Sequence, residues 1–535
     1  MTSSDRPLTR PEWLFLGLVV LGWAGFVVAL GKDMSWDFRN YHWYIPYAFL
    51  HGRMGFDIAV AHHATYYNPL IDIPFFLAAE HLPSWLALGL LGAVQGANII
   101  PLYLIARSLI RVEHNMQMAA IAALLGVTGG LNLSLAGMTL YDNVMSLFAL
   151  SGLALLIVRR DVLANGPLKR ALAIAALAGF ILGSAVGLKL PEAPYAIGFA
   201  AALAVVPGDA KRRLQRLLAG GAGGVAGVAV FAGYWFMHMA HVTGNPLFPY
   251  FNELFHSPLA LTTSYRDTRF LPQDIWHVLF DPIYFALDWH AADDIPNQDM
   301  RVALAYLGIL AAAGIWFFRR RAKEPLAAPD GSLILFAFWA ASYASWLMVF
   351  GIYRYILTLE MLSPVAVVAA AGSFPLPRQV RLWALGALAL VTLAYTRAEK
   401  VQPRAPLGDP YVQVKMPGIA DPAHSMILMT GIEPMGYLVP ELPPQIPVLR
   451  IDGWLIQPND GSTLTADTRA RVAGFRGDLY LIAAPDEIAR AHGAVGAYGL
   501  GFTNIACADI TTNLGGPYLF CPLTRNAKPA PNAKS

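Results

Sequence analysis

The first 396 residues consist of long apolar runs separated by short polar segments. A helix needs about 20 largely apolar residues to cross a bilayer, and eleven runs approach that length. They cover residues 13–31, 84–106, 117–132, 139–158, 171–188, 193–206, 217–240, 301–318, 331–350, 355–373 and 382–396. A further run, 69–82, is shorter and predicts a re-entrant or interfacial segment, with a twelfth span as the alternative. The pattern predicts an all-α polytopic membrane protein with about eleven transmembrane helices.

The pattern changes after residue 396. Short strand-like runs (426–430, 447–451 and 478–484) alternate with the helix-like stretches 464–474 and 486–494. We therefore expect a transmembrane module, 1–396, followed by a small C-terminal α/β domain, 397–535. Cys507 and Cys521 are the only cysteines of the chain. If this domain lies in an oxidising compartment, the two cysteines are expected to form a disulfide, with two unpaired thiols as the alternative.

The positions of Lys and Arg orient the spans. If the N-terminus lies inside, every inner loop is basic, as the positive-inside rule requires. The basic residues of these loops are Arg107, Arg111, Arg159, Arg160, Lys169, Arg170, Lys211, Arg212, Arg213, Arg216, Arg319, Arg320, Arg321, Lys323, Arg378 and Arg381. The C-terminal domain and the loop 241–300 then lie outside. We expect a bacterial inner-membrane protein with a cytoplasmic N-terminus and an extracytoplasmic C-terminal domain.

Composition agrees with this assignment. Hydrophobic residues make up 56% of the chain and charged residues only 14%, whereas soluble domains have about 25% charged residues. The net charge of +3 carries no signal for a nucleic-acid partner. The glycine-rich segment 220–228 has no preceding strand and no Lys-Ser/Thr ending, so it predicts close helix packing rather than a nucleotide loop.

An acidic residue in an aromatic setting follows the first span. The stretch 35–53 reads SWDFRNYHWYIPYAFLHGR and contains Asp37, with Tyr41 and Tyr44 after it at helical spacing. An ordinary solvated Asp or helix cap within an interfacial aromatic belt is one interpretation. The other is a general base, because partial burial against aromatic rings raises the pKa of a carboxyl group.

Three further charged residues are expected on the same outer side. Asp142 falls at the outer end of the fourth span, Lys189 lies between the fifth and sixth spans, and Arg354 lies at the outer end of the tenth. Charges at membrane depth are costly and are functional candidates. Lys189 and Arg354 are suited to a lipid phosphate. A helix cap is the alternative for Asp142, and a tight turn with snorkelling charges is the alternative for Lys189.

The segment AHHATYYNP, 61–69, adds two histidines and two tyrosines. Adjacent histidines point in different directions in a strand or loop, so His62 and His63 are weak metal candidates and no metal site is assigned. Aromatic faces stack on sugar rings and amides bind hydroxyl groups. We expect a wall facing a sugar or lipid, formed by Tyr41, Tyr44, Tyr66, Tyr67, Asn68 and Tyr353.

Taken together, residues 1–400 resemble the GT-C superfamily of integral membrane glycosyltransferases. The first outer loop with Asp37, MTLYDNVMSLFAL with Asp142, GSAVGLKLPEAP with Lys189 and YRYILTLEMLSP with Arg354 occur in the order typical of the family. The match departs from the family where many members have a pair of acidic residues in the first loop, because the next acid after Asp37 is Asp57.

The resemblance implies an inverting transfer of a sugar from a polyprenyl-phosphate donor to a hydroxyl group of a glycan, lipid or protein. It implies that Asp37 is the general base, that Asp142 is the second acidic residue on the acceptor side, and that Lys189 and Arg354 bind the donor phosphate. No cofactor is assigned, and a divalent metal remains open. Three other functions stay as alternatives: a transporter or flippase of lipid-linked sugars, a polysaccharide ligase or polymerase using a lipid-pyrophosphate donor, and a non-enzymatic membrane scaffold.

Overall fold

The computed structural model describes residues 6–288, 297–318, 322, 324–398 and 403–526. The basic residues Arg319, Arg320, Arg321 and Lys323 lie outside the described residues. The chain forms two compact units. The first, the helical unit, comprises Met1–Leu30, Leu88–Tyr234 and Asp267–Gln402, and the second, the mixed unit, comprises Gly31–Ala87, Trp235–Arg266 and Pro403–Ser535. The division expected at residue 397 stays a prediction, but the tail groups with two segments from the first half of the chain.

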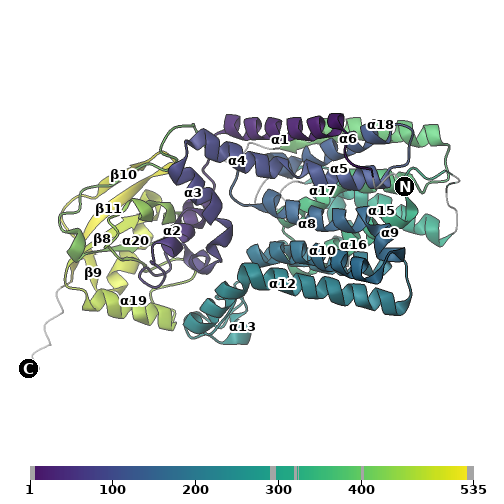
Figure 1. Ribbon diagram of the computed structural model, residues 1–535. Helices are drawn as coiled ribbons and strands as arrows, with labels where there is room; N and C mark the ends of the chain where they lie inside the picture. Colours follow the sequence, from purple (N-terminus) through teal and green to yellow (C-terminus); the bar gives the residue numbers. More distant parts are fainter. Residues whose placement is uncertain (1–5, 289–296, 319–321, 323, 399–402, 527–535) are drawn as a thin grey trace, which may run out of the picture. The chain divides into compact units, whose positions relative to one another are not determined.

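Apolar helices build the helical unit (Figure 1). They are α1 (Arg10–Leu30), α4 (Ser84–Gly96), α5 (Ile99–Leu109), α6 (Asn115–Val127), α7 (Gly130–Ser134), α8 (Asp142–Val158), α9 (Arg160–Asn165), α10 (Leu168–Leu188), α11 (Ala193–Val205), α12 (Ala210–Thr243), α14 (Ile275–Leu287), α15 (Arg301–Phe317), α16 (Pro329–Val349), α17 (Leu357–Ala371) and α18 (Arg378–Tyr395). Two short strands, β2 (Asn297–Gln298) and β3 (Arg397–Ala398), pair antiparallel within the same unit.

Six helical segments among the described residues are long and apolar enough to cross a membrane. They are Arg10–Leu30, Ser84–Leu109, Leu168–Leu188, Ala210–Thr243, Pro329–Val349 and Tyr353–Ala371. The count of about eleven is therefore not confirmed, because several expected spans are shorter. The run 117–132 is interrupted after Val127, and the run 139–158 becomes helical only at Asp142, since Tyr141 has a left-handed backbone with φ 63°. The second interruption lies directly before Asp142, a candidate site residue.

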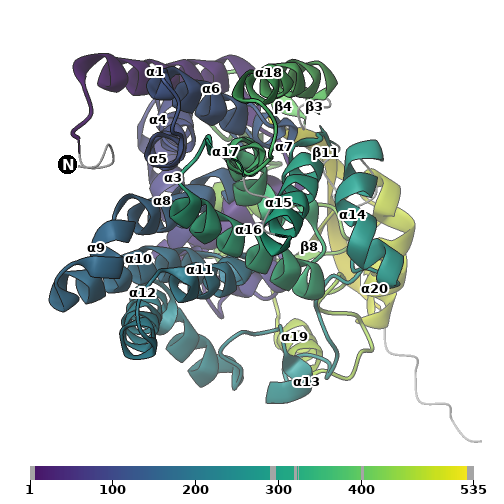
Figure 2. The same ribbon diagram turned by 90° about the vertical axis from the view of Figure 1, so that its right-hand side faces the viewer.

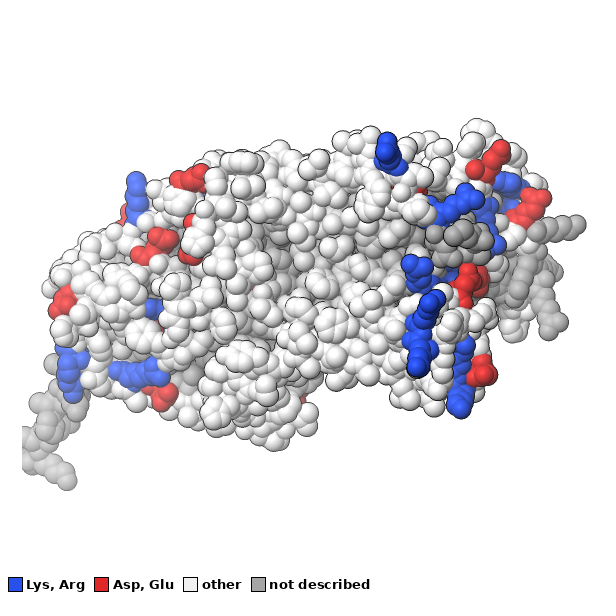
Figure 3. Space-filling model, in the orientation of Figure 1, with Lys and Arg blue, Asp and Glu red and all other residues white. Residues whose placement is uncertain are grey.

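The charged residues of the helical unit separate into two ends. α8 runs from Asp142 toward Arg159, and α10 runs from Lys169 toward Lys189, so each helix carries basic residues at one end and a candidate site residue at the other. Lys and Arg gather near α9 and the first turn of α12, whereas the helix flanks beside them are uncharged (Figure 3). This pattern is the one expected of helices whose basic ends face one membrane surface.

Small residues let α10 and α12 pack closely. The two helices lie side by side with α11 (Figure 2). A Cβ atom added to Gly183 would lie 2.0 Å from the carbonyl oxygen of Gly224, and one added to Gly223 would lie 2.0 Å from that of Ala176. The close packing expected of the segment 220–228 is therefore present, and it follows from helix backbones in direct contact.

A seven-stranded sheet forms the centre of the mixed unit. Its strands are β5 (Val414–Lys415), β6 (Ser425–Met429), β7 (Val448–Arg450), β8 (Asp478–Ala483), β9 (Leu500–Phe502), β10 (Ala508–Thr512) and β11 (Gly515–Arg525). Their order is β5-β10-β11-β8-β6-β7, with β9 paired to β11. β7 and β8 flank β6 in parallel, and the other pairs are antiparallel. The α/β character expected of the tail is thus present.

Helices from three parts of the chain complete this unit. They are α2 (Tyr44–Leu50), α3 (Ile73–His81), α13 (Asn252–Phe255), α19 (Thr463–Gly474) and α20 (Ile488–Ala497). The run 69–82 contributes the 3₁₀ helix Pro69–Ile71 and the nine-residue helix α3. A short ladder, β1 (Lys32–Asp33) with β4 (Arg404–Ala405), joins the first loop to the tail. Because Ile58 and Phe248 lie in one apolar core with Leu449 and Leu481, the two earlier segments of this unit and the tail fold as one body.

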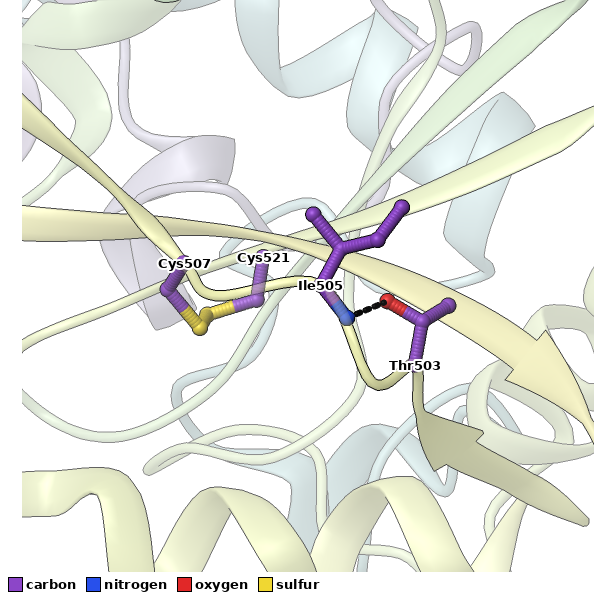
Figure 4. The surroundings of a disulfide bond; sticks show 4 residues. All are labelled: Thr503, Ile505, Cys507 and Cys521. Carbon is purple, nitrogen blue, oxygen red and sulfur yellow. Dashed lines mark hydrogen bonds between the residues drawn. A yellow bond between two sulfur atoms is a disulfide. The ribbon is translucent and has the colours of Figure 1, made fainter.

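The two cysteines form a disulfide, as expected (Figure 4). The Cα atoms of Cys507 and Cys521 lie 4.3 Å apart, and the bond closes a loop of sequence separation 14. Cys521 belongs to β11, while Cys507 immediately precedes β10. The bond therefore fixes the start of β10 against the neighbouring strand.

Candidate functional site

Lys189 and Asp142 form an ion pair at the end of the helical unit opposite the basic loops. The Lys189 Nζ atom donates hydrogen bonds to Asp142 Oδ1 and, at 2.8 Å, to the carbonyl oxygen of Leu140. The side chain of Lys189 is 19% exposed, whereas that of Asp142 is 2% exposed. The ammonium group is thus held in a defined place and remains partly accessible.

Arg354 reaches the same place through Tyr355. The guanidinium carbon of Arg354 lies 5.2 Å from the centroid of the Tyr355 ring, and its Nη2 donates to the Tyr355 hydroxyl at 3.3 Å. The Nζ atom of Lys189 lies 5.5 Å from the same centroid. Two cations that share one aromatic ring are suited to an anion that contacts both, such as a phosphate. Arg354 and Tyr355 both belong to the short 3₁₀ helix Tyr353–Ile356, which directly precedes α17.

Glu192 adds a second carboxyl group to this cluster. It ends the 3₁₀ helix Leu190–Glu192, three residues after Lys189, and it is 3% exposed. Glu192 Oε2 and Asp142 Oδ2 are buried and have no hydrogen-bond partner among the described residues. Since buried polar atoms are normally paired, these oxygens are available to accept hydrogen bonds from ligand hydroxyl groups. We call Asp142, Lys189, Glu192, Arg354 and Tyr355 the cation cluster.

Asp37 belongs to the mixed unit, where a group of aromatic rings surrounds its loop. The Trp36 ring lies 4.8 Å from that of Trp454, between centroids, and the His63 ring stacks on Trp454 at 6.0 Å. The pKa of His63 is lowered to about 4 because burial disfavours the imidazolium ion, and the charge of Asp37 opposes that shift. The carboxylate of Asp37 therefore lies within electrostatic range of His63.

Tyrosines extend this group of rings. Tyr67 stacks on Tyr250 with a centroid distance of 6.0 Å, and their hydroxyl groups share a hydrogen bond. The Tyr41 ring meets Tyr67 edge-on at 5.5 Å, and that of His63 lies 5.8 Å from Tyr67. Tyr41, Tyr67 and His63 are all partly exposed. Tyr41 and Tyr67, two of the tyrosines named from the sequence, therefore belong to this group of rings.

Other expected wall residues have a different environment. Tyr44 is buried and donates to Asp57 Oδ2 at 3.1 Å, and Tyr353 is buried and donates to Glu360 Oε2 at 2.9 Å. The Tyr66 ring packs edge-on against Phe248 at 4.9 Å. Asn68 accepts a hydrogen bond from Leu70 N at 3.1 Å, which caps the next turn. Tyr44 and Tyr353 thus contact groups inside the fold, whereas Tyr66 and Asn68 are partly exposed. That these residues face a sugar or lipid stays a prediction.

The acid that follows Asp37 in the sequence has a structural role. Asp57 is buried and receives hydrogen bonds from Arg53 Nε and Nη2, both at 2.7 Å. It also accepts from Val448 N at 2.9 Å, while Arg53 donates to the carbonyl oxygens of Pro444 and Ile446. This pair attaches the first outer loop to the segment that leads into β7.

The weak metal candidates, His62 and His63, lie against aromatic rings. His62 Nδ1 accepts a hydrogen bond from Trp454 N at 3.2 Å, and its ring stacks on Trp36 at 6.1 Å. Among the residues that the structure describes, no group of three or more His, Cys, Asp or Glu side chains is arranged to hold a metal ion.

Acid should destabilise the mixed unit through His63. The folded-state pKa of about 4 lies below the ordinary value of 6.5, so the neutral ring contributes stability that is present above pH ~6.5 and lost as the pH falls toward 4. We expect the thermal unfolding midpoint in detergent to fall over this range, and His63→Gln to reduce the fall. The exposed His424 provides the control His424→Gln. Equal slopes for the His63→Gln variant and the unaltered protein would contradict the assignment.

Sequence reasoning did not identify Glu192, Tyr355, Trp36 and Trp454 as site residues. Glu192 follows Lys189 by three residues, and Tyr355 directly follows Arg354. Their closeness in sequence to the expected cations was therefore the signal that could have identified them. No comparable local signal marks Trp454, because it meets His62 across 392 residues of sequence.

No family model, curated protein or solved structure matches the chain.

Proposed function

We propose that the protein is a membrane glycosyltransferase that transfers a sugar from a polyprenyl-phosphate donor to an acceptor hydroxyl group outside the cytoplasm. The observation that carries this proposal is the convergence of Lys189 and Arg354 on the ring of Tyr355. The two cations lie at the end of the helical unit opposite its basic loops. Cations of this kind suit a lipid phosphate at headgroup depth, because they offset its negative charge where water is scarce.

Each residue has a role in an inverting displacement. Asp37 takes the proton of the acceptor hydroxyl, whose oxygen forms a bond to the anomeric carbon of the donor sugar. The bond from this carbon to the phosphate oxygen breaks, and its electron pair leaves with the polyprenyl phosphate. Lys189 and Arg354 stabilise the charge that grows on the phosphate, which is the contribution that preorganised cations make in water-poor sites. Asp142 and Glu192 orient Lys189 and accept hydrogen bonds from sugar hydroxyl groups.

The disulfide supports an extracytoplasmic location for the mixed unit, because such bonds persist in oxidising compartments. The basic helix ends support a cytoplasmic location for the opposite end of the helical unit. A transporter of lipid-linked sugars is less well supported, because Lys189 and Arg354 both lie at one end of the helices rather than along a pathway.

Removing Arg354 should reduce sugar transfer strongly. The assay supplies radiolabelled polyprenyl-phosphate sugars to the protein in proteoliposomes with acceptors from an envelope extract. We expect Arg354→Ala to lower turnover by about 10²–10³-fold, the loss typical when one preorganised charge-stabilising group is removed. Arg354→Lys should restore part of the rate, because it keeps the charge but loses the planar fork.

The matched control is Arg170→Ala, which removes an exposed arginine at the opposite end of α10. It should leave transfer unchanged. If the unaltered protein neither transfers nor releases sugar from any donor of this class, or if Arg354→Ala retains normal turnover, the proposed function is wrong.

A further inference from the structure

The parallel strands of the mixed unit end at one edge of the sheet. β7 and β8 lie on opposite sides of β6. After β6 the chain therefore forms β7 on one side of this strand and then crosses to form β8 on the other side. In open α/β sheets, such a switch point is the place where ligands bind. The loops after these strands contain Gly431, Trp454 and Glu487.

The first outer loop reaches the same edge. Ile58 N donates to Val448 O at 3.0 Å, and Arg450 N donates to Ile58 O at 2.9 Å, so the loop runs parallel beside β7. The backbone then turns sharply, because Ala59 and His62 have φ values of 49° and 55°. This turn brings His62 and His63 against Trp454, and thereby brings the Asp37 loop to the carboxyl edge.

The backbone amides at this edge of the sheet are not open to a phosphate. The backbone amides of Ile432 and Glu433, which follow β6, donate to the carboxylate of Glu487 at 2.7 and 3.2 Å. Gly431 is required there, because it has φ 92° and a Cβ atom on it would lie 2.0 Å from Glu487 Oε2. A nucleotide site would need these amides for its phosphates. Here a carboxylate already occupies them.

The cations of this edge are also engaged. Arg450 is buried and donates to the carbonyl oxygens of Gly431 at 2.6 Å and Val60 at 2.8 Å. Arg490 pairs with Asp452. An uncharged ligand therefore fits this edge better than an anion.

The carboxyl edge of the sheet exposes aromatic side chains. Trp454 is 47% exposed although it contacts Trp36, His62 and His63. Trp36 is itself partly exposed. A rigid aromatic face beside polar groups binds a ligand that is apolar on one side and polar on its rim. A pyranose ring has that character, since its C–H groups form a face and its hydroxyl groups form the rim.

We infer that the carboxyl edge of this sheet binds a sugar ring of the acceptor, stacked on Trp454 and Trp36, next to the carboxylate of Asp37. The acceptor is thus a glycan or a glycosylated molecule, rather than a bare lipid or protein hydroxyl group. The assignment of this sugar to an acceptor rests on the proposed function. The sugar-binding site itself stands on the geometry of the mixed unit alone.

The test measures sugar binding without donor. Methyl glycosides of glucose, galactose, mannose and N-acetylglucosamine are added at about 10 mM to the full-length protein in nanodiscs, which would nearly fill a site with a Kd of ~1 mM. Binding is followed by saturation-transfer NMR. No donor is present, so no transfer occurs during the measurement, which is repeated with the Asp37→Asn variant. We expect at least one glycoside to bind and Trp454→Ala to raise its Kd about tenfold.

Two further variants separate stacking from a general effect. Trp454→Phe keeps an aromatic face and should recover most of the affinity. Trp383→Ala removes a tryptophan that is 78% exposed on α18 in the helical unit, and it should leave the Kd unchanged. If no glycoside binds, or if Trp454→Ala and Trp383→Ala have equal Kd values, the inference is overturned. Binding that depends on Trp454 in a protein without transfer activity would uphold the sugar site and reject the proposed function.

Discussion

Asp37→Asn should lower the turnover of sugar transfer by about 10³-fold, because the amide cannot accept the acceptor proton and a positioned general base contributes roughly 10²–10⁴-fold. Asn has nearly the same shape as Asp, and Asp37 is only partly buried. The substitution should therefore leave the fold intact. The measurement is single-turnover transfer from a radiolabelled polyprenyl-phosphate sugar, with thermal unfolding as a check on folding.

The control is Asp478→Asn, which changes an exposed carboxylate at the start of β8, at the other edge of the sheet. It should transfer sugar at the normal rate. The donor affinity of Asp37→Asn should also be normal, because Lys189 and Arg354 are unchanged. Normal turnover by Asp37→Asn would remove Asp37 from the chemistry, whereas a lost donor affinity would show that its role is binding.

Arg53→Ala should destabilise the mixed unit by about 3–5 kcal/mol, the usual result when one partner of a buried ion pair is removed. Asp57 would remain buried with its charge, and the carbonyl oxygens of Pro444 and Ile446 would lose their donor. Unfolding in detergent, followed by the fluorescence of the tryptophans, measures the change. Arg476→Ala, at an exposed position in the same unit, should change stability by less than about 0.5 kcal/mol.

A double variant distinguishes the charge from the contacts. Arg53→Met with Asp57→Leu removes both charges and keeps most of the volume. Such replacements are often neutral or stabilising, so the double variant should be more stable than Arg53→Ala. If it is less stable, the hydrogen bonds to the backbone before β7 matter more than the buried charge.

The cation cluster was largely predictable, and the wall around Asp37 was predictable only in part. Asp142, Lys189 and Arg354 were expected at one end because helices that cross in alternation bring every second loop to the same side. Tyr44 was expected beside Asp37 from a 3.6-residue period. Residues Phe38–His42 instead form a π-helical turn, which changes that period, and the Tyr44 hydroxyl bonds to Asp57.

The remaining differences come from contacts between distant parts of the chain. The eleven spans were read from apolar runs, but the helix of one run ends at Val127 and the helix of another begins only at Asp142. Trp454 follows an ordinary strand in an ordinary loop, and only the fold places it against Trp36 and His62. Hydrophobic periodicity describes a segment and the face that it buries; it does not specify which distant segment covers that face.

The pairing of Ile58 with Leu449 has a consequence for biogenesis. The loop that contains Asp37 leaves the ribosome early, but the strand that it lies beside is made about 390 residues later, as is the backbone that Asp57 binds. Contacts of such long range form late. The newly made loop must wait, without its partner strand, until the tail has been synthesised. A chain that ends before residue 403 would lack β7, and its first loop would have no strand to pair with.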